Sequence, residues 1–232
     1  MSEGSQFPRS RSGLGKTRTL MSRTVLLALL LLAITGCAPT TAPLRENVDL
    51  NSVGDFALTE RDGSTVHKAD LLGKVWVASF VFTRCTGPCP QVTSTMARLQ
   101  QDLPAERDDI RLVTFTVDPD HDRPDELKRY ADAFTADPKR WLFLTGKEAD
   151  IHQLLREGFR VPVQANGGEE RRPGNEVMHS TRLVVVDKKG HVRGYFDGIV
   201  ETGDDLEVAK KDFEQNYKRL CAKVLDLARE TP

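Results

Sequence analysis

Two cysteines in this chain have a spacing and position that could support redox or metal chemistry. Cys85 and Cys89 are separated by three residues and follow an apolar run at residues 74–82, where a helix is expected to begin. The N-terminus of a helix carries unpaired N–H groups and partial positive charge, which stabilise a thiolate and lower its pKa. Positions i and i+4 lie on one face of a helix, so the two sulfurs are expected to meet at a common point if the first turn is helical. That point would suit one disulfide or one soft metal ion.

His179 is the candidate for a third donor. It lies just before a predicted strand, where the chain is expected to return toward the cysteines. Two thiolates and one neutral imidazole form a ligand set that suits copper in both oxidation states. Zinc is the competing metal, but structural zinc normally has four protein ligands. Neither Cys37 nor Cys221 is expected to supply a fourth.

Other interpretations of the same residues remain open. The cysteines could form a structural disulfide, and His179 could be a loop histidine held by a hydrogen bond. A thiol–disulfide oxidoreductase would use Cys85 as its nucleophile and Cys89 as its resolving thiol. Thr83, two residues before Cys85, also suggests a peroxidase, although no proline precedes that threonine. The histidine discriminates between these functions, because a copper carrier needs it and a pure oxidoreductase does not.

The elements that must position these residues alternate between strands and helices. Strands are predicted at 55–59, 63–67, 74–82, 110–117, 141–144, 181–187 and 191–196, and helices at 91–101, 125–134, 151–159 and 204–229. Buried strands separated by helices indicate parallel pairing. The fold class is therefore α/β, a thioredoxin-like fold with an N-terminal β-hairpin extension. Residues 162–176 are polar and rich in glycine and proline, and are predicted to form an inserted mobile loop before the C-terminal hairpin.

The first 49 residues are expected to direct and tether the chain rather than to fold. Basic residues precede a ten-residue apolar run at 25–34, too short to span a bilayer, so residues 1–36 are interpreted as a signal peptide. The sequence Ile34-Thr-Gly-Cys37 resembles the bacterial lipobox, which implies lipidation of Cys37. Residues 37–49 would form a tether and residues 50–232 the domain. This arrangement predicts a lipid-anchored protein outside the cytoplasmic membrane, on its periplasmic face.

Composition excludes some classes of partner. The 232 residues carry a formal net charge of −1, and aromatic residues make up only 6%. Without a basic field or an aromatic stacking surface, nucleic acid is not an expected partner. A hydrophobic fraction of 39% is typical of a globular core and argues against a bundle of membrane spans.

Three segments together resemble the SCO/SenC family of copper chaperones. They are residues 82–90, residues 116–124, and His179-Ser180 with the glycine-containing hairpin that follows. The resemblance covers roughly residues 50–225 by our count of matching segments. It implies a thioredoxin-like fold and one copper bound by Cys85, Cys89 and His179, with Asp118 close to the ligands. It also implies a role in assembling the dinuclear copper centre of cytochrome c oxidase. The expected partner is the copper-bearing subunit of that oxidase or another copper protein.

Overall fold

The structure is a computed structural model that describes residues 52–167, 174, 177–201 and 205–231. The predicted signal peptide, the lipidation site Cys37 and the tether lie outside the described residues, as does part of the predicted loop at 162–176. No helix in the described part of the chain combines the length and apolar character that crossing a membrane requires.

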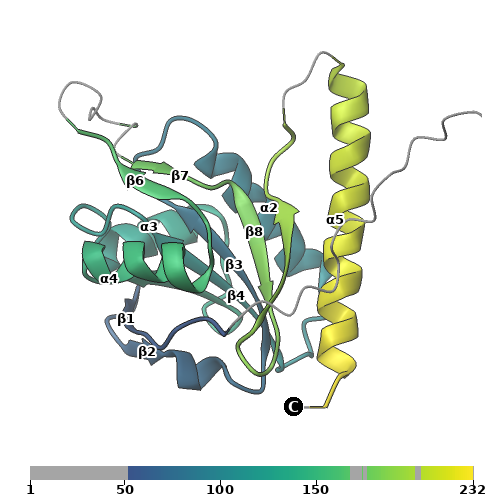
Figure 1. Cartoon of the computed structure of the whole chain (residues 1–232), viewed down its shortest axis with the longest axis horizontal. Coiled ribbons are helices and arrows are strands. Elements are labelled where there is room, and N and C mark those ends of the chain that lie inside the picture. The colour runs from purple at the N-terminus through teal and green to yellow at the C-terminus, as the bar shows by residue number, and fades with distance from the viewer. Residues whose placement is uncertain (1–51, 168–173, 175–176, 202–204, 232) are drawn as a thin grey trace, which may run out of the picture. The chain divides into compact units, whose positions relative to one another are not determined.

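A seven-stranded sheet with the order β2–β1–β5–β4–β3–β8–β9 forms the centre of the described domain (Figure 1). Its strands are β1 (Ala57–Glu60), β2 (Thr65–His67), β3 (Val75–Val81), β4 (Ile110–Thr116), β5 (Trp141–Thr145), β8 (Arg182–Val186) and β9 (Val192–Asp197). The three central strands β3, β4 and β5 are parallel, and every other pair is antiparallel. The predicted α/β class is confirmed.

Helices connect the parallel strands and close the chain. They are α2 (Cys89–Asp102), α3 (Pro124–Ala133), α4 (Glu148–Gln153), the π-helical turn η2 (Leu154–Gly158) and α5 (Leu206–Arg229), with a 3-10 turn η1 (Lys68–Leu71) after β2. Helix α5 runs beside β8 and β9, away from the edge formed by β1 and β2 (Figure 1). The Asp205 side chain begins α5 by accepting hydrogen bonds from two backbone N–H groups of its first turn.

The predicted N-terminal hairpin is also confirmed. β1 and β2 are joined at Gly63, whose φ of +87° is a conformation that favours glycine. The N–H of Glu60 donates to the carbonyl of Ser64 at 2.8 Å, which closes the turn. The sequence did not indicate that β1 also pairs with β5, which joins the hairpin to the main sheet.

The core explains why β3 can carry a functional loop at its end. All seven residues of β3 are buried, because both faces of the sheet are covered. On one face, Trp76 and Phe80 pack against Phe159, which follows η2, with ring centroids 5.8 and 5.1 Å away. On the other, Trp141 packs against Phe143 of the same strand and donates its indole N–H to Thr114. The loop after β3 therefore starts from a fixed strand.

The predicted loop at residues 162–176 requires a correction. It begins with a strand, β6 (Val163–Ala165), which pairs with β7 (Val177–His179) in a separate two-stranded antiparallel sheet. The glycines and prolines of the segment lie outside the three residues that pair. Val163 and Val177 are buried, which gives this ribbon an apolar side. The ribbon carries His179 at its end.

Candidate metal centre

Cys85 and Cys89 lie where the chain passes from β3 into α2, but they do not share a helical face. Helix α2 begins at Cys89, so Cys85 lies in the preceding loop and the condition for a shared helical face, a helical turn from Cys85 onward, is not met. A helix beginning at Cys85 would hold Pro90 in its interior, where proline removes a hydrogen bond, whereas proline is tolerated in the first turn of the observed helix. A turn instead brings Cys85 back, with its N–H donating to the carbonyl of Phe82 at 3.2 Å. The two thiols are still close enough for Cys85 to raise the pKa of Cys89.

His179 reaches the same point from the ribbon. Its Nε2 lies 3.3 Å from the sulfur of Cys89. Its other ring nitrogen, Nδ1, lies 3.0 Å from the carbonyl oxygen of Ser180, which can only accept a hydrogen bond. Nδ1 therefore carries the proton, and the lone pair of Nε2 faces the sulfur. The ring of Phe82 packs edge-on against the imidazole at 5.8 Å and fixes its plane.

The protonation of this group differs from the expectation based on the helix N-terminus. The hydrogen bond with Cys85, followed by burial, raises the pKa of the Cys89 thiol well above its ordinary value of 9.0. A backbone hydrogen bond from Phe82 acts in the opposite sense but does not prevail. Burial lowers the pKa of His179 below its ordinary value of 6.5. At neutral pH the centre therefore holds a thiol and a neutral imidazole rather than a thiolate and an imidazolium.

The described residues contain neither a closed disulfide nor a complete metal cluster. Cys85, Cys89 and Cys221 are all reduced, and Cys221 lies on α5. Within the described ranges, no three cysteine, histidine or acidic side chains are grouped closely enough to hold a metal ion as they are arranged. The donor set nevertheless suits a soft metal, because two sulfurs and one imidazole nitrogen are soft or borderline ligands. The same contact between two thiols also suits oxidation to a disulfide.

A cavity of about 450 Å³ opens beside the centre. Its wall contains the sulfur-bearing Cys85, the imidazole of His179, and apolar and small residues from the cysteine loop and the ribbon: Phe82, Thr86, Gly87, Pro88, Asn166, Gly174, Val177 and Met178. Met178 is 58% exposed on the ribbon. Cys89 is completely buried, so the cavity gives access to the centre through Cys85 and His179.

Gly174 joins the inserted segment to the cysteine loop. Its φ of +87° favours glycine, and a Cβ there would approach the hydroxyl of Thr86 to 2.8 Å. Gly174 and the cysteine loop thus pack without room for a side chain at this position.

Two buried aspartates follow β4, and only one was expected from the sequence to matter. Asp118, which is 2% exposed, accepts a hydrogen bond at 2.9 Å from the guanidinium of Arg84, the neighbour of Cys85. Asp122 is completely buried, and its carboxylate accepts hydrogen bonds from both the backbone N–H and the hydroxyl of Thr83. The sequence analysis singled out Asp118 and overlooked Asp122. The spacing of two acids four residues apart after a buried strand was the available signal.

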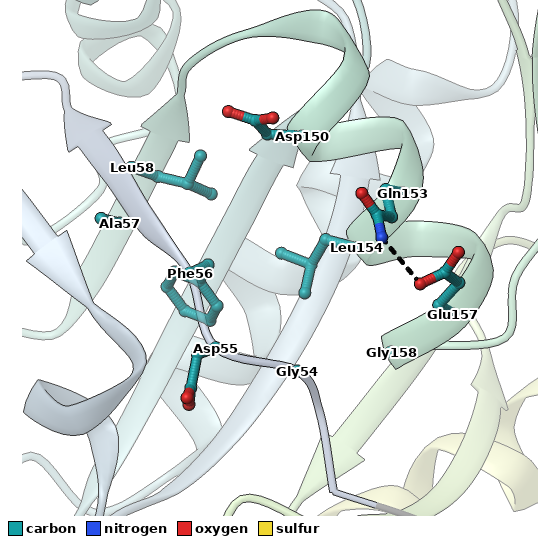
Figure 2. A pocket seen from close by; sticks show the side chains of 10 residues that line it. All are labelled: Gly54, Asp55, Phe56, Ala57, Leu58, Asp150, Gln153, Leu154, Glu157 and Gly158. Atoms are coloured by element: carbon teal, nitrogen blue, oxygen red, sulfur yellow. Dashed lines mark hydrogen bonds between the residues drawn. The ribbon is translucent and has the colours of Figure 1, made fainter.

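A second cavity, of about 350 Å³, is distinct from the candidate centre (Figure 2). It lies between the segment before β1 and the helices α4 and η2, and Asp55, Phe56 and Leu154 are among its lining residues. Figure 2 shows Gln153 donating to Glu157 at its rim, at 2.9 Å. Its described lining residues include neither cysteine nor histidine.

Comparison with known proteins identifies close structural relatives. A SCO1/SenC family lipoprotein of Bacillus anthracis has a TM-score of 0.61 and 34% identity, covering 75% of this chain and 98% of that one. BsSco, a member of the Sco family of cytochrome c oxidase assembly proteins with a disulfide switch, has a TM-score of 0.63 and 28% identity. That match covers 81% of this chain and 99% of BsSco. These neighbours confirm the thioredoxin-like fold.

A more distant structure is that of ScoI from Bradyrhizobium japonicum with copper bound. It has a TM-score of 0.56 and 23% identity over 72% of this chain and 99% of that one, which supports the fold alone.

The sequence comparisons point to one family. A SCO1 protein homolog of Bacillus subtilis is 34% identical over 154 residues, which is 66% of this chain and 77% of the relative. The family model of SCO1/SenC matches residues 45–211. The chain therefore belongs to the SCO1/SenC family.

Proposed function

We propose that this chain is a membrane-tethered copper metallochaperone that binds one copper ion through Cys85, Cys89 and His179. The observation that carries the proposal is the contact of 3.3 Å between the Cys89 sulfur and the lone pair of His179 Nε2. A pair of redox thiols has no need of an imidazole in that position. Copper in either oxidation state accepts sulfur and imidazole donors together.

Copper loading must release protons from the thiols. The Cys89 thiol is protonated at neutral pH, and a thiolate is the form that binds a metal. Copper would replace the proton that Cys89 shares with its neighbours, while His179 would bind through Nε2 without losing a proton. Cys85, at the wall of the cavity, would turn its sulfur toward the same ion.

The tether and the acceptor complete the proposal. We propose that Cys37 is lipidated and that residues 37–49 link it to the domain, which places the copper site outside the cytoplasmic membrane. A family relative from Bacillus anthracis is a lipoprotein. We also propose that the acceptor is the copper-bearing subunit of cytochrome c oxidase, since BsSco belongs to a family of oxidase assembly proteins. The open cavity beside Cys85 gives an acceptor access to the bound ion.

The test is a titration of the reduced chain with Cu(I) and Cu(II). Wild type should bind one copper and show a thiolate-to-Cu(II) charge-transfer band. His179→Ala should lose or greatly weaken that band, and Cys85→Ser and Cys89→Ser should abolish it. Cys221→Ala is the matched control, because this cysteine lies on α5 away from the centre. Copper binding that is indifferent to His179, or equally sensitive to Cys221, would exclude this site.

A thiol–disulfide oxidoreductase is the second candidate function, and the proximity of the two thiols, by which Cys85 raises the pKa of Cys89, favours it. Cys85 borders the cavity and would attack a partner disulfide, after which Cys89 would displace the reduced partner. Two electrons and two protons would pass to the partner while Cys85 and Cys89 become a disulfide. Turnover with a disulfide substrate that is unchanged in His179→Ala, together with no stoichiometric copper binding, would establish this function instead.

A further inference from the structure

Asp122 is a buried carboxylate that is not among the proposed copper ligands. It lies between β4 and α3, is completely shielded from solvent, and accepts hydrogen bonds on both oxygens. Oδ2 receives the N–H of Thr83 at 2.9 Å and the hydroxyl of Thr116 at 2.6 Å. Oδ1 receives the hydroxyl of Thr83 at 2.5 Å and faces Nδ1 of His121 at 3.1 Å. Burial of a carboxylate is costly unless it is satisfied in this way.

The two bonds to Thr83 fix the start of the cysteine loop. Thr83 lies two residues before Cys85. Its N–H and hydroxyl each donate a hydrogen bond to a different oxygen of the Asp122 carboxylate, and we call this pair of bonds the clamp. The next hydrogen bond of the loop runs from the N–H of Cys85 to the carbonyl of Phe82. The path of the chain from β3 to Cys85 is therefore set by one clamp and one turn.

Asp118 makes a different contact. Its carboxylate receives a side-chain hydrogen bond from Arg84, whose side chain is 37% exposed. A flexible arginine side chain holds the backbone less tightly than direct bonds to a backbone N–H and a short hydroxyl. Asp122 is thus the carboxylate better placed to hold the loop itself.

We infer that Asp122 is a positioning residue for the copper centre: by clamping Thr83 it holds Cys85 in the conformation that meets Cys89 and His179. This inference rests on the proposed function, but its geometric content concerns the two thiols with or without copper. Asp122 touches neither thiol in any hydrogen bond described above. Its charge also contributes to the raised pKa of the Cys89 thiol, but its effect on the path of the loop passes through Thr83 and the turn that follows.

The test compares three threonine substitutions in the full chain. Thr83→Val keeps the backbone N–H bond but removes the hydroxyl bond to Asp122, while Thr83→Ser retains a hydroxyl and should restore wild-type behaviour. Thr114→Val is the matched control. Its hydroxyl is buried two residues before Thr116 on β4, where it bonds Ser79 and Trp141 in the core rather than the loop. Thermal unfolding of all three variants shows whether losses of stability are comparable.

Two readouts separate positioning from general destabilisation. Thr83→Val should bind copper about three- to tenfold more weakly, as expected for loss of one hydrogen bond, with a shifted charge-transfer band. In the copper-free chain equilibrated with glutathione, its Cys85–Cys89 disulfide should form less readily by a similar factor, since misplaced thiols have a lower effective concentration. Glutathione disulfide takes up the two electrons and two protons in that reaction.

The outcomes distinguish the two claims. If wild type binds copper and Thr83→Val matches Thr114→Val in both readouts, the positioning role is wrong. If either copper affinity or disulfide formation stays below its wild-type value in Thr83→Ser, the claim that the Thr83 hydroxyl holds the loop is also wrong. If wild type binds no copper but Thr83→Val still weakens the disulfide relative to Thr114→Val, the proposed function fails and the positioning role is supported.

Discussion

Cys89 and His179 reach one point from two regions of different construction. Cys89 begins α2, is completely buried, and follows a strand whose seven residues are all buried. His179 ends β7, which pairs with β6 in a two-stranded sheet separate from the main one. Met178, its neighbour, is 58% exposed. The cysteine side is part of the core, whereas the histidine side is a small ribbon laid against it.

This difference has a consequence for metal binding. An isolated two-stranded sheet is only marginally stable, so the ribbon depends on its contacts with the domain. The bond between Cys89 and His179 and the packing of Phe82 against the imidazole are two of those contacts. A copper ion shared by both regions would add a third. Perturbing each region in turn should therefore separate stability of the fold from affinity for copper.

The largest effect on stability is expected from the core side. Phe80→Ala removes a completely buried ring that packs against Phe115 and Phe159. We expect the free energy of unfolding to fall by about 3–5 kcal/mol, as for other aromatic truncations in cores. Chemical denaturation followed by far-UV circular dichroism measures the loss. The fraction that remains folded should still bind one copper. A folded Phe80→Ala variant that binds no copper would show that stability of the fold and affinity for copper cannot be separated in this way.

The next effect is the pH dependence of copper affinity. The pKa of Cys89 is raised, so its thiol keeps a proton between about pH 6.5 and 8.5 and must release it to the metal. His179 has a lowered pKa and is neutral across that range, so it adds no proton. Affinity should therefore rise at least about tenfold for each unit of increasing pH, the expected dependence for one displaced proton. Competition titrations at several pH values measure the slope, and an affinity independent of pH would contradict the protonated state of Cys89.

The smallest effect is expected from the ribbon. Val163 is buried and lies directly opposite His179 in the β6–β7 pair, so its side chain packs on the same face as the imidazole. Val163→Ala should weaken the packing of the ribbon by about 1–2 kcal/mol and lower copper affinity, with little change in global unfolding. Gln164→Ala is the matched control, since successive residues of a strand face opposite sides, and this exposed residue does not line the cavity beside the centre. Equal affinities for the two variants would show that the ribbon does not hold the imidazole in place.

The sequence predicted the cysteine side well because its signals are local. A continuous apolar run specifies a strand buried on both faces, and cysteines directly after it lie at the strand's end. Helix α2 begins at Cys89, two residues before the predicted start at residue 91, which still leaves Cys85 in the loop. The thiol pKa was predicted in the wrong direction because the helix N-terminus was considered without burial and the bond to Cys85.

The histidine side and the aspartate clamp could not be derived in the same way. β6 is three residues long, within a segment whose glycines and prolines indicate a loop. Its pairing with β7 joins residues 12 to 16 positions apart, and no local pattern encodes that contact. Asp118 and Asp122 lie four residues apart in the loop after β4. Only the folded loop shows that Asp122 contacts Thr83 while Asp118 contacts Arg84.

X-ray absorption at the copper edge, on the reduced chain loaded with one equivalent of Cu(I), reports the ligands of the bound ion. We expect a coordination shell of two sulfur scatterers and one imidazole nitrogen, with the nitrogen signal lost in His179→Ala and both sulfurs retained. A shell composed only of nitrogen and oxygen, or a shell unchanged by His179→Ala, would contradict a copper centre built from the core cysteines and the ribbon histidine.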